Sequence, residues 1–278
     1  MKKLLAIAAL SLMSFCAFAA DLTKRSNAPV SPLTFVNAPI SWAGVYAGLS
    51  VGYVGTKNTI YIDYADTRYF PDFRGGESMR HRSRSAFGGG EIGYNLQSGS
   101  IVYGLFAAAT GMSASDKTWS NGACCGSGDD MFTSNLRSIN IVGGRLGFAF
   151  DRALFYGEAG FALGYSQMNL TDANVRQNGS TSNDSIASKV LSKWLPGLSL
   201  GVGMDYALNQ SWRVGVNYRY VNFGSPNWNM TTSSYSSNGT YRGEATYLLK
   251  TRGLDAHMIG LSAKFYFGGS AAPVVARY

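Results

Sequence analysis

The sequence has few charged residues for its length. Asp, Glu, Lys and Arg together make up 14% of the 278 residues, whereas soluble domains carry about 25%. So little charge cannot cover a water-facing surface of ordinary polarity, which argues against a soluble protein. Basic residues still outnumber acidic ones, and the formal net charge is +8. This surplus suits contact with an anionic surface.

A long hydrophobic run is also missing. No stretch beyond residue 20 approaches the ~20 apolar residues that a membrane-spanning helix needs, so a membrane could be crossed only by strands. The short apolar run Leu4–Leu12 follows two lysines and precedes the small-residue site Ala17-Phe18-Ala19. This is the pattern of a secretory signal peptide, which we expect to be residues 1–20.

Catalytic and metal-binding motifs are absent from the sequence. There is no phosphate-binding loop, HExxH or nucleophile-elbow motif, so we expect no catalytic residues and no enzyme. After the signal peptide the only cysteines are Cys124 and Cys125. An exported chain meets an oxidising compartment, where these two could close a vicinal disulfide that staples a loop. A zinc site would need further ligands nearby, and we expect no metal.

The sequence does contain eight segments in which apolar and small or polar residues alternate. In the last one, apolar residues at every second position from Ile259 to Phe267 alternate with Gly260, Ser262, Lys264 and Tyr266. Alternation with period two predicts strands that have one apolar face. The predicted strands are 42–56, 84–97, 101–115, 136–150, 153–170, 193–208, 212–224 and 254–267.

The connections between these strands are long and short in turn. Outer-membrane barrels have long extracellular loops and short periplasmic turns. We therefore predict an all-β fold, an eight-stranded antiparallel transmembrane up-and-down β-barrel over residues 42–267, in the outer membrane of a Gram-negative bacterium. Residues 21–41 would be a periplasmic N-terminal segment or, alternatively, would thread into the lumen. Residues 268–278 would be a C-terminal tail.

The polar faces of the strands indicate which side meets lipid. They are rich in glycine, which suits the narrow lumen of an eight-stranded barrel better than the exposed face of a soluble one. The opposite faces carry aliphatic residues, with aromatic residues toward both ends as in interfacial girdles. One strand breaks this pattern, because Ile139 and Ile141 face away from Leu146 and Phe148. A bulge at Gly143-Gly144 would reset the alternation.

Charged residues on the predicted lumenal face form the first candidate site. They are Glu91, Arg145, Glu158, Asp205, Arg213, Arg219 and Lys264. Enclosed charges need partners, so we expect an internal ion-pair network that fills the bore. The alternative is a selectivity constriction in a narrow diffusion pore. Because eight strands leave room for little more than side chains, the structural role is favoured.

The first and last strands resemble a known family. The opening Trp42–Gly48, followed by Gly52, resembles the W-x-G-x-Y-x-G-x-x-x-G pattern of the small outer-membrane barrels of alphaproteobacteria. These are the Omp25/Omp31-like proteins of the porin family, which include the hemin-binding proteins of Bartonella. The closing Gly260–Phe267 is similar to their final strand. The resemblance implies a surface-exposed eight-stranded barrel of the cell envelope, with hemin binding in some members.

The family's last strand usually ends the chain. Here eleven further residues follow it. The terminal aromatic that the barrel-assembly machinery normally reads would be Phe267, which belongs to the strand pattern, or Tyr278.

Hemin binding would need an axial ligand and basic groups for the propionates. The first long connection offers Tyr61, Tyr64, Tyr69 and His81 as ligands, and Arg80 and Arg82 as propionate partners. Alternatively, tyrosine is simply abundant, at 17 residues, and the arginines contact lipopolysaccharide phosphates. We expect a structural, surface-exposed role in the envelope. The alternatives are a narrow pore, or a binder of hemin or host surface molecules. Location excludes nucleic acid as a partner.

Overall fold

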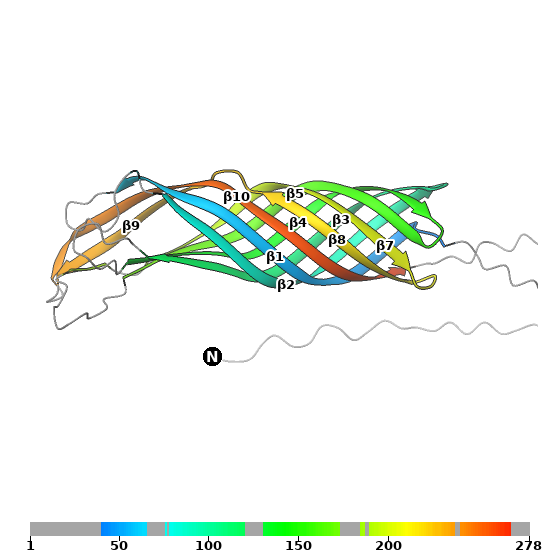
Figure 1. Cartoon of the computed structure of the whole chain (residues 1–278), viewed down its shortest axis with the longest axis horizontal. Coiled ribbons are helices and arrows are strands. Elements are labelled where there is room, and N and C mark those ends of the chain that lie inside the picture. The colour runs from blue at the N-terminus through cyan, green and yellow to red at the C-terminus, as the bar shows by residue number, and fades with distance from the viewer. Residues whose placement is uncertain are drawn as a thin grey trace, which may run out of the picture. The chain divides into compact units, whose positions relative to one another are not determined.

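The computed structural model describes residues 40–65, 76, 78–119, 130–172, 184–186, 189–236 and 240–267. All regular structure in these ranges is β (Figure 1), and they contain no helix that is long and apolar enough to span a bilayer. The strands are β1 Gly44–Ala65, β2 Ser78–Ser98, β3 Ile101–Trp119, β4 Asp130–Phe150, β5 Ala153–Asp172, β6 Asp184–Ile186, β7 Lys189–Ala207, β8 Trp212–Asn222, β9 Asn227–Ser236 and β10 Tyr241–Phe267.

Eight strands form a closed antiparallel ring in the order β1-β2-β3-β4-β5-β7-β8-β10, and β10 pairs back to β1. The short strands β6 and β9 lengthen this wall. β9 pairs with the part of β10 that lies beyond β8, and β6 pairs with β9. Figure 1 shows the tilted wall strands, with β9 and the outer part of β10 at one end. The predicted eight-stranded barrel is confirmed.

The strands are longer than the sequence predicted. β1 and β2 stay paired as far as Tyr61 and Ser78, so much of the expected loop 57–83 is strand, and the same is true of 225–253. The cause is a change on the outer face, which becomes polar beyond the apolar band while Ile60, Ile62 and Met79 remain buried inside. Alternation therefore continues, but without the lipid-facing residues that make it visible in the sequence.

The outer wall is apolar, as the alternation predicted. Large side chains such as Leu49 (74% exposed), Leu105 (71%) and Phe161 (77%) point away from the lumen. A water-facing surface does not carry a continuous apolar band of this kind, so the band marks contact with lipid. Close to the turn between β7 and β8, the rings of Trp212 and Phe265 and those of Phe265 and Phe267 pack edge to face, as expected of an interfacial girdle.

The predicted bulge at Gly143-Gly144 is wrong. β4 keeps an unbroken register with β5 from Ser138 to Phe150, and the irregularity lies instead between Leu136 and Ser138. Ile139 and Ile141 are buried in the lumen. The lumen is itself apolar at this level, so apolar residues occupy both faces of the strand and no reset is needed.

The interior of the barrel holds two apolar clusters. The turn-end cluster lies near the short turns and consists of Trp42, Tyr46, Val102, Leu154, Tyr156, Ala207 and Tyr266. The larger cluster lies inside the lumen at the end away from the short turns, and we call it the outer cluster. It includes Phe87, Phe106, Ile139, Ile141 and Phe223, and it continues along β9 and β10 through Trp228, Met230, Tyr247 and Leu249. Six buried charged residues lie between these two clusters, namely Glu91, Arg145, Glu158, Asp205, Arg219 and Lys264.

The lipid-facing assignment predicts the effect of placing a charge on the outer wall. Leu261→Arg and Val216→Arg put a cation within the apolar band, and each should disfavour insertion by ~2–4 kcal/mol near the bilayer midplane. Ser192→Arg, at an exposed site of β7 outside the band, should insert normally. The measurement is urea-dependent folding into lipid vesicles. Equal stability of all three variants would contradict the assignment.

Candidate functional site

The candidate site is a cluster of six charged side chains in the lumen, each from a different strand. The carboxylates are Glu91 on β2, Glu158 on β5 and Asp205 on β7, and the cations are Arg145 on β4, Arg219 on β8 and Lys264 on β10. All six are buried. Three negative and three positive charges balance, which is required where water cannot solvate a surplus charge.

Glycines in register with these residues make the space for them. Gly48 pairs with both Glu91 and Lys264, and Gly201 pairs with both Glu158 and Arg219. A Cβ on Gly201 would lie 2.8 Å from the Glu158 carboxylate, and one on Gly48 would lie 2.8 Å from Lys264 Cγ. The glycine-rich lumenal faces are therefore the reason that long charged side chains fit.

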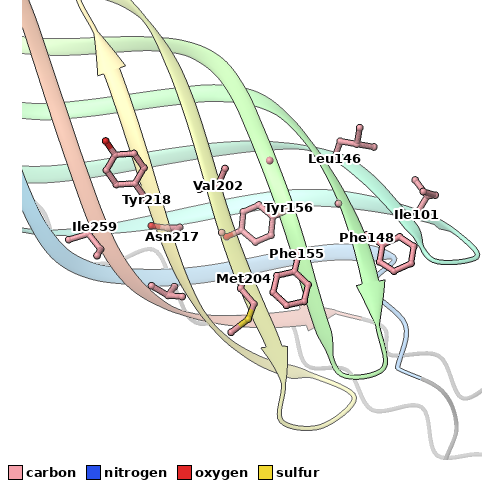
Figure 2. A pocket seen from close by; sticks show the side chains of 14 residues that line it. Ile101, Leu146, Phe148, Phe155, Tyr156, Val202, Met204, Asn217, Tyr218 and Ile259 are labelled. Carbon is pink, nitrogen blue, oxygen red and sulfur yellow. The ribbon is translucent and has the colours of Figure 1, made fainter.

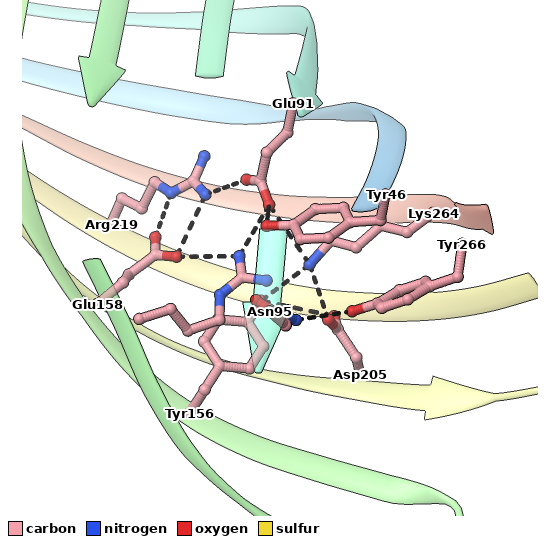
Figure 3. A network of polar contacts seen from close by, with 10 residues as sticks. Tyr46, Glu91, Asn95, Tyr156, Glu158, Asp205, Arg219, Lys264 and Tyr266 are labelled. Carbon is pink, nitrogen blue, oxygen red and sulfur yellow. Dashed lines mark hydrogen bonds and ion pairs between the residues drawn. The ribbon is translucent and has the colours of Figure 1, made fainter. Parts of the chain in front are cut away.

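Two glutamates and two arginines form a closed ring of charge-assisted hydrogen bonds (Figure 3). Arg145 Nη2 donates to Glu91 Oε1 at 2.8 Å and to Glu158 Oε2 at 3.3 Å. Arg219 Nη2 donates to Glu91 Oε2 at 2.5 Å, and its Nε donates to Glu158. Each arginine thus bridges both glutamates, and each glutamate binds both arginines. The ring ties β2, β4, β5 and β8 together across the bore.

Lys264 joins this ring to Asp205. Its Nζ lies 2.7 Å from Asp205 Oδ2 and 3.7 Å from Glu91 Oε1. Tyrosines enclose the group: Tyr46 donates to Glu91 Oε1 at 2.9 Å, and the Arg145 guanidinium lies 4.1 Å from the centroid of the Tyr156 ring. Buried hydrogen-bonded networks of this kind stabilise one arrangement of their members, because each polar group depends on its neighbours.

Arg213 corrects one part of the predicted network. It is buried, but its Nη1 donates to Asn209 O at 2.6 Å and its Nη2 to Ser41 O at 2.8 Å. Its guanidinium lies 4.6 Å from the Tyr266 ring centroid. Alternation fixes the face of a residue but not the direction of a long side chain along the barrel. Arg213 is the second residue of β8, so the carbonyls at the short-turn end of the barrel are within its reach.

The start of the barrel is held at the same end. The Trp42 backbone N–H donates to Gln97 Oε1 at 2.7 Å, and the indole is fully buried in the turn-end cluster. Together with the Ser41 carbonyl on Arg213, this places residues 41 and 42 inside the mouth of the barrel. Residues 21–39 lie outside the described part of the chain.

The predicted hemin residues do not all share a face. Arg80 and Arg82 are exposed on the outer wall of β2, whereas His81 between them is buried in the lumen. Because all three are in a strand and not in a loop, alternation separates the proposed ligand from the proposed propionate partners. Tyr61 lies on the outer wall, with the Arg252 guanidinium 5.3 Å from its ring centroid. The structure thus separates His81 from the arginines, whereas Tyr61 shares the outer wall with Arg80 and Arg82. A hemin site that uses Tyr61 stays a prediction.

Other candidates cannot be placed. The side chain of Tyr64 is not described, and Tyr69, Cys124 and Cys125 lie outside the described residues.

His81 lies beyond the apolar band, and its Nδ1 is 3.7 Å from Asp116 Oδ2. Burial lowers the pKa of this imidazole, while the nearby carboxylate acts to raise the same pKa.

The tyrosines of the network were not recognised from the sequence. Tyr46 and Tyr156 lie on the lumenal face, where the sequence shows chiefly glycine and charge. Each covers a glycine on the next strand: a Cβ on Gly93 would lie 2.5 Å from Tyr46 Cζ, and one on Gly203 would lie 2.5 Å from Tyr156 Cζ. These tyrosines occupy the same alternate strand positions as the lumenal glycines, and that signal could have identified them.

The chemistry that this arrangement allows is limited. Each carboxylate of the network is bound to a cation, and within the described ranges no group of three or more His, Cys, Asp or Glu residues could hold a metal ion. The surface depressions lie on the lipid-facing wall. Figure 2 shows one of them, lined by Phe155, Val202 and Met204 among others. The geometry thus supports a structural role for the charged network, which ties the strands of the wall together and fills the bore.

Comparison with known proteins gives matches along the whole barrel. Residues 7–267 match the family described as outer membrane protein beta-barrel domain. The chain is 28% identical over 231 residues to the 31 kDa outer-membrane immunogenic protein of Brucella melitensis, which covers 82% of this chain and 89% of the relative. It is 27% identical over 205 residues to the 22 kDa outer membrane protein of Rhizobium leguminosarum, with 72% and 74% covered.

Among solved structures, the outer membrane protein OprG from Pseudomonas aeruginosa is similar. The identity is 14%, the alignment covers 81% of this chain and 97% of OprG, and the TM-score is 0.40.

The buried network predicts a large effect when one partner is neutralised. Glu158→Gln leaves the arginines without a full counter-charge in a dry site, and should lower the free energy of unfolding by about 3–5 kcal/mol. Asp63→Asn is the control, because it breaks the exposed Lys250–Asp63 pair of 2.8 Å and should cost at most about 1 kcal/mol. Urea unfolding in lipid vesicles measures both. Losses of equal size would show that the network is solvated.

The tyrosine–glycine contacts predict a steric effect. Gly93→Ala should displace the Tyr46 ring and break its hydrogen bond to Glu91, with a loss of roughly 1–3 kcal/mol. Gly88→Ala, on the outer wall of the same strand, meets no atom within 4 Å and should change stability by less than about 0.5 kcal/mol. The same unfolding assay compares the two, and an unaffected Gly93→Ala would refute the close packing.

Proposed function

The chain belongs to the outer membrane protein β-barrel domain family, and on this premise we propose that its barrel is closed and that its role is structural. It is an outer-membrane protein of a Gram-negative bacterium. The proposed role is to stabilise the envelope and to present the outer ends of its strands at the cell surface. No enzymatic activity is proposed.

Filling of the lumen is the observation that carries this proposal. A permeating ion would meet two barriers in series. The first is the outer cluster, where Phe87, Phe106 and Ile139 are buried across the bore. An apolar constriction of this kind excludes water and ions by dewetting. The second is the network, whose charges are already paired with one another, so they offer a passing ion no free counter-charge.

The outer part of the wall supports surface exposure. Beyond the apolar band, β1 and β2 continue as a paired extension, and so do β9 and β10. Their inner sides are packed by Ile62, Trp228 and Leu249, while their outer sides carry charged and polar residues. A packed, water-exposed extension of the barrel can present a defined surface, in contrast to a long flexible loop.

The remaining parts of the predicted organisation belong to the same proposal. Residues 1–20 would be removed as a signal peptide, 21–41 would lead from the periplasm into the barrel mouth, and 268–278 would form a periplasmic tail. The lipid and lipopolysaccharide of the outer membrane are the proposed surroundings, and the barrel-assembly machinery is the proposed route of insertion. A narrow diffusion pore is the alternative function, and it needs a continuous water path through the network.

Single-channel recording separates the closed barrel from the pore. The refolded chain in a planar lipid bilayer should give no discrete conductance steps, because both barriers exclude ions. Heat-modified mobility on gel electrophoresis verifies that the same sample is folded, and a general porin in the same bilayer verifies detection. Reproducible steps of uniform size from the folded chain would contradict the proposal and favour the pore.

A further inference from the structure

Five cations gather on the outer wall where the apolar band ends. We call this group the arginine patch: Lys57 on β1, Arg80, Arg82 and Arg84 on β2, and Arg252 on β10. The three β2 arginines alternate with buried His81 and Ser83, so they share one face and are spaced about 6.6 Å apart along the strand.

The patch brings like charges together, although Lys57 also lies opposite Asp255 on β10. Lys57 and Arg82 are direct cross-strand partners, and Thr59 lies between Arg80 and Arg252 in register. Like charges placed opposite each other destabilise a sheet. Within the described residues no patch side chain forms a salt bridge. This arrangement is expected where an external anion supplies the missing charge.

Nearby carboxylates are bound to other groups. Asp255 accepts from Tyr220 at 2.8 Å and from Asn222 at 2.6 Å, and Asp63 pairs with Lys250 at 2.8 Å. Asp116 accepts the backbone N–H of Arg82 at 2.7 Å. Hydrogen bonds from neutral groups occupy Asp255 and Asp116, and a salt bridge occupies Asp63, so none of these carboxylates forms a salt bridge with a patch guanidinium group.

The height of the patch matches lipid headgroups. On the outer face of β2, Leu96 lies near the periplasmic end, twelve positions along the strand from Arg84. At a rise of ~3.3 Å per residue and a tilt of ~40°, this distance spans about 30 Å along the bilayer normal. The apolar band of such barrels is ~25 Å tall, so Arg84 lies just beyond the hydrocarbon, and Arg82 and Arg80 lie above it.

Below the patch the outer wall is hollowed. A groove is lined on its outer side by Ala47, Gly90, Ile92, Ala107, Ala109 and Val142. Elsewhere at the outer boundary the wall carries aromatic rings, namely Tyr165 with Trp194 and Tyr220 with His257. On β2 and β3 the groove is walled by small residues, although Phe161 also lines it and Tyr53 is exposed on β1 between the groove and the patch. Gly90 of the groove lies six positions along β2 from Arg84, so an acyl chain whose headgroup sits on the patch could reach the groove.

We propose that this face binds a phosphorylated glycolipid of the outer leaflet, of the lipid A class, with its phosphates on the arginine patch and an acyl chain in the groove. This inference rests on the proposed envelope function and names its partner. Guanidinium groups bind phosphate oxygens through paired hydrogen bonds, and only an amphiphile joins phosphate and hydrocarbon at the required positions. A soluble anion would leave the groove unused.

The test compares two triple variants that lose the same charge. The patch variant is R80Q/R82Q/R84Q, and the control is R137Q/K189Q/K193Q, which removes three exposed cations from β4 and β7. The refolded full chain in neutral detergent is titrated with bisphosphorylated lipid A, and complexes are counted by native mass spectrometry. The wild type and the control should bind alike, and the patch variant should bind at least about tenfold more weakly.

A second variant tests the groove without changing charge. Ala109→Phe fills the groove from the lipid side, and should weaken lipid A binding while leaving the binding of inorganic phosphate unchanged. Its folding is checked by heat-modified mobility, as for the triple variants.

Three probes distinguish the source of the phosphate. Dephosphorylated lipid A should fail to bind, and inorganic phosphate and phosphatidylglycerol should compete only weakly. Equal binding of dephosphorylated lipid A, equal competition by inorganic phosphate, or equal affinity of the patch variant would each overturn the proposal. The bilayer recording is independent, since a conducting wild type would refute the closed barrel and leave the lipid A result unchanged.

Discussion

Pairing of charges inside a dry bore is the interaction on which the rest of the structure depends. Eight strands enclose too little space for both side chains and water, so a charge that faces inward must find its partner on another strand. Glu91 and Glu158 each bind both Arg145 and Arg219. The glycines opposite them, and the tyrosines around them, follow from the need to fit and hydrogen-bond these groups.

The same alternation serves three environments along one strand. On β2, outward positions carry Ile92 and Tyr94 in the apolar band, then the small Gly88 and Gly90, and then arginine at the headgroup level. Inward positions change from Glu91 in the network to Phe87 in the outer cluster. The fold, the closure of the bore and the proposed lipid site therefore follow from one alternating pattern, whose inward and outward residues change in kind along the barrel axis.

The sequence predicted the features that follow from the two-residue alternation of the strands. It missed the features that depend on how far along the barrel axis a residue lies. The ring, its short turns, the lipid-facing side and the lumenal face of the charges follow from alternation. The direction of Arg213 along the bore does not, nor does the apolar upper lumen that receives Ile139. The length of β1 and β2 was underestimated because the outward residues become polar above the membrane. The same extension puts His81 and Arg80 on opposite faces, which a loop would not require.

The most direct test of the central claim is the coupling free energy between Glu158 and Arg219, from a double-mutant cycle of Glu158→Gln and Arg219→Gln measured by unfolding in lipid vesicles. A dry, mutually dependent network predicts that the double variant is less destabilised than the sum of the two single variants, by about 1.5–3 kcal/mol. A coupling near zero would mean that water solvates each charge separately, and it would contradict a bore closed by the pairing of its own side chains.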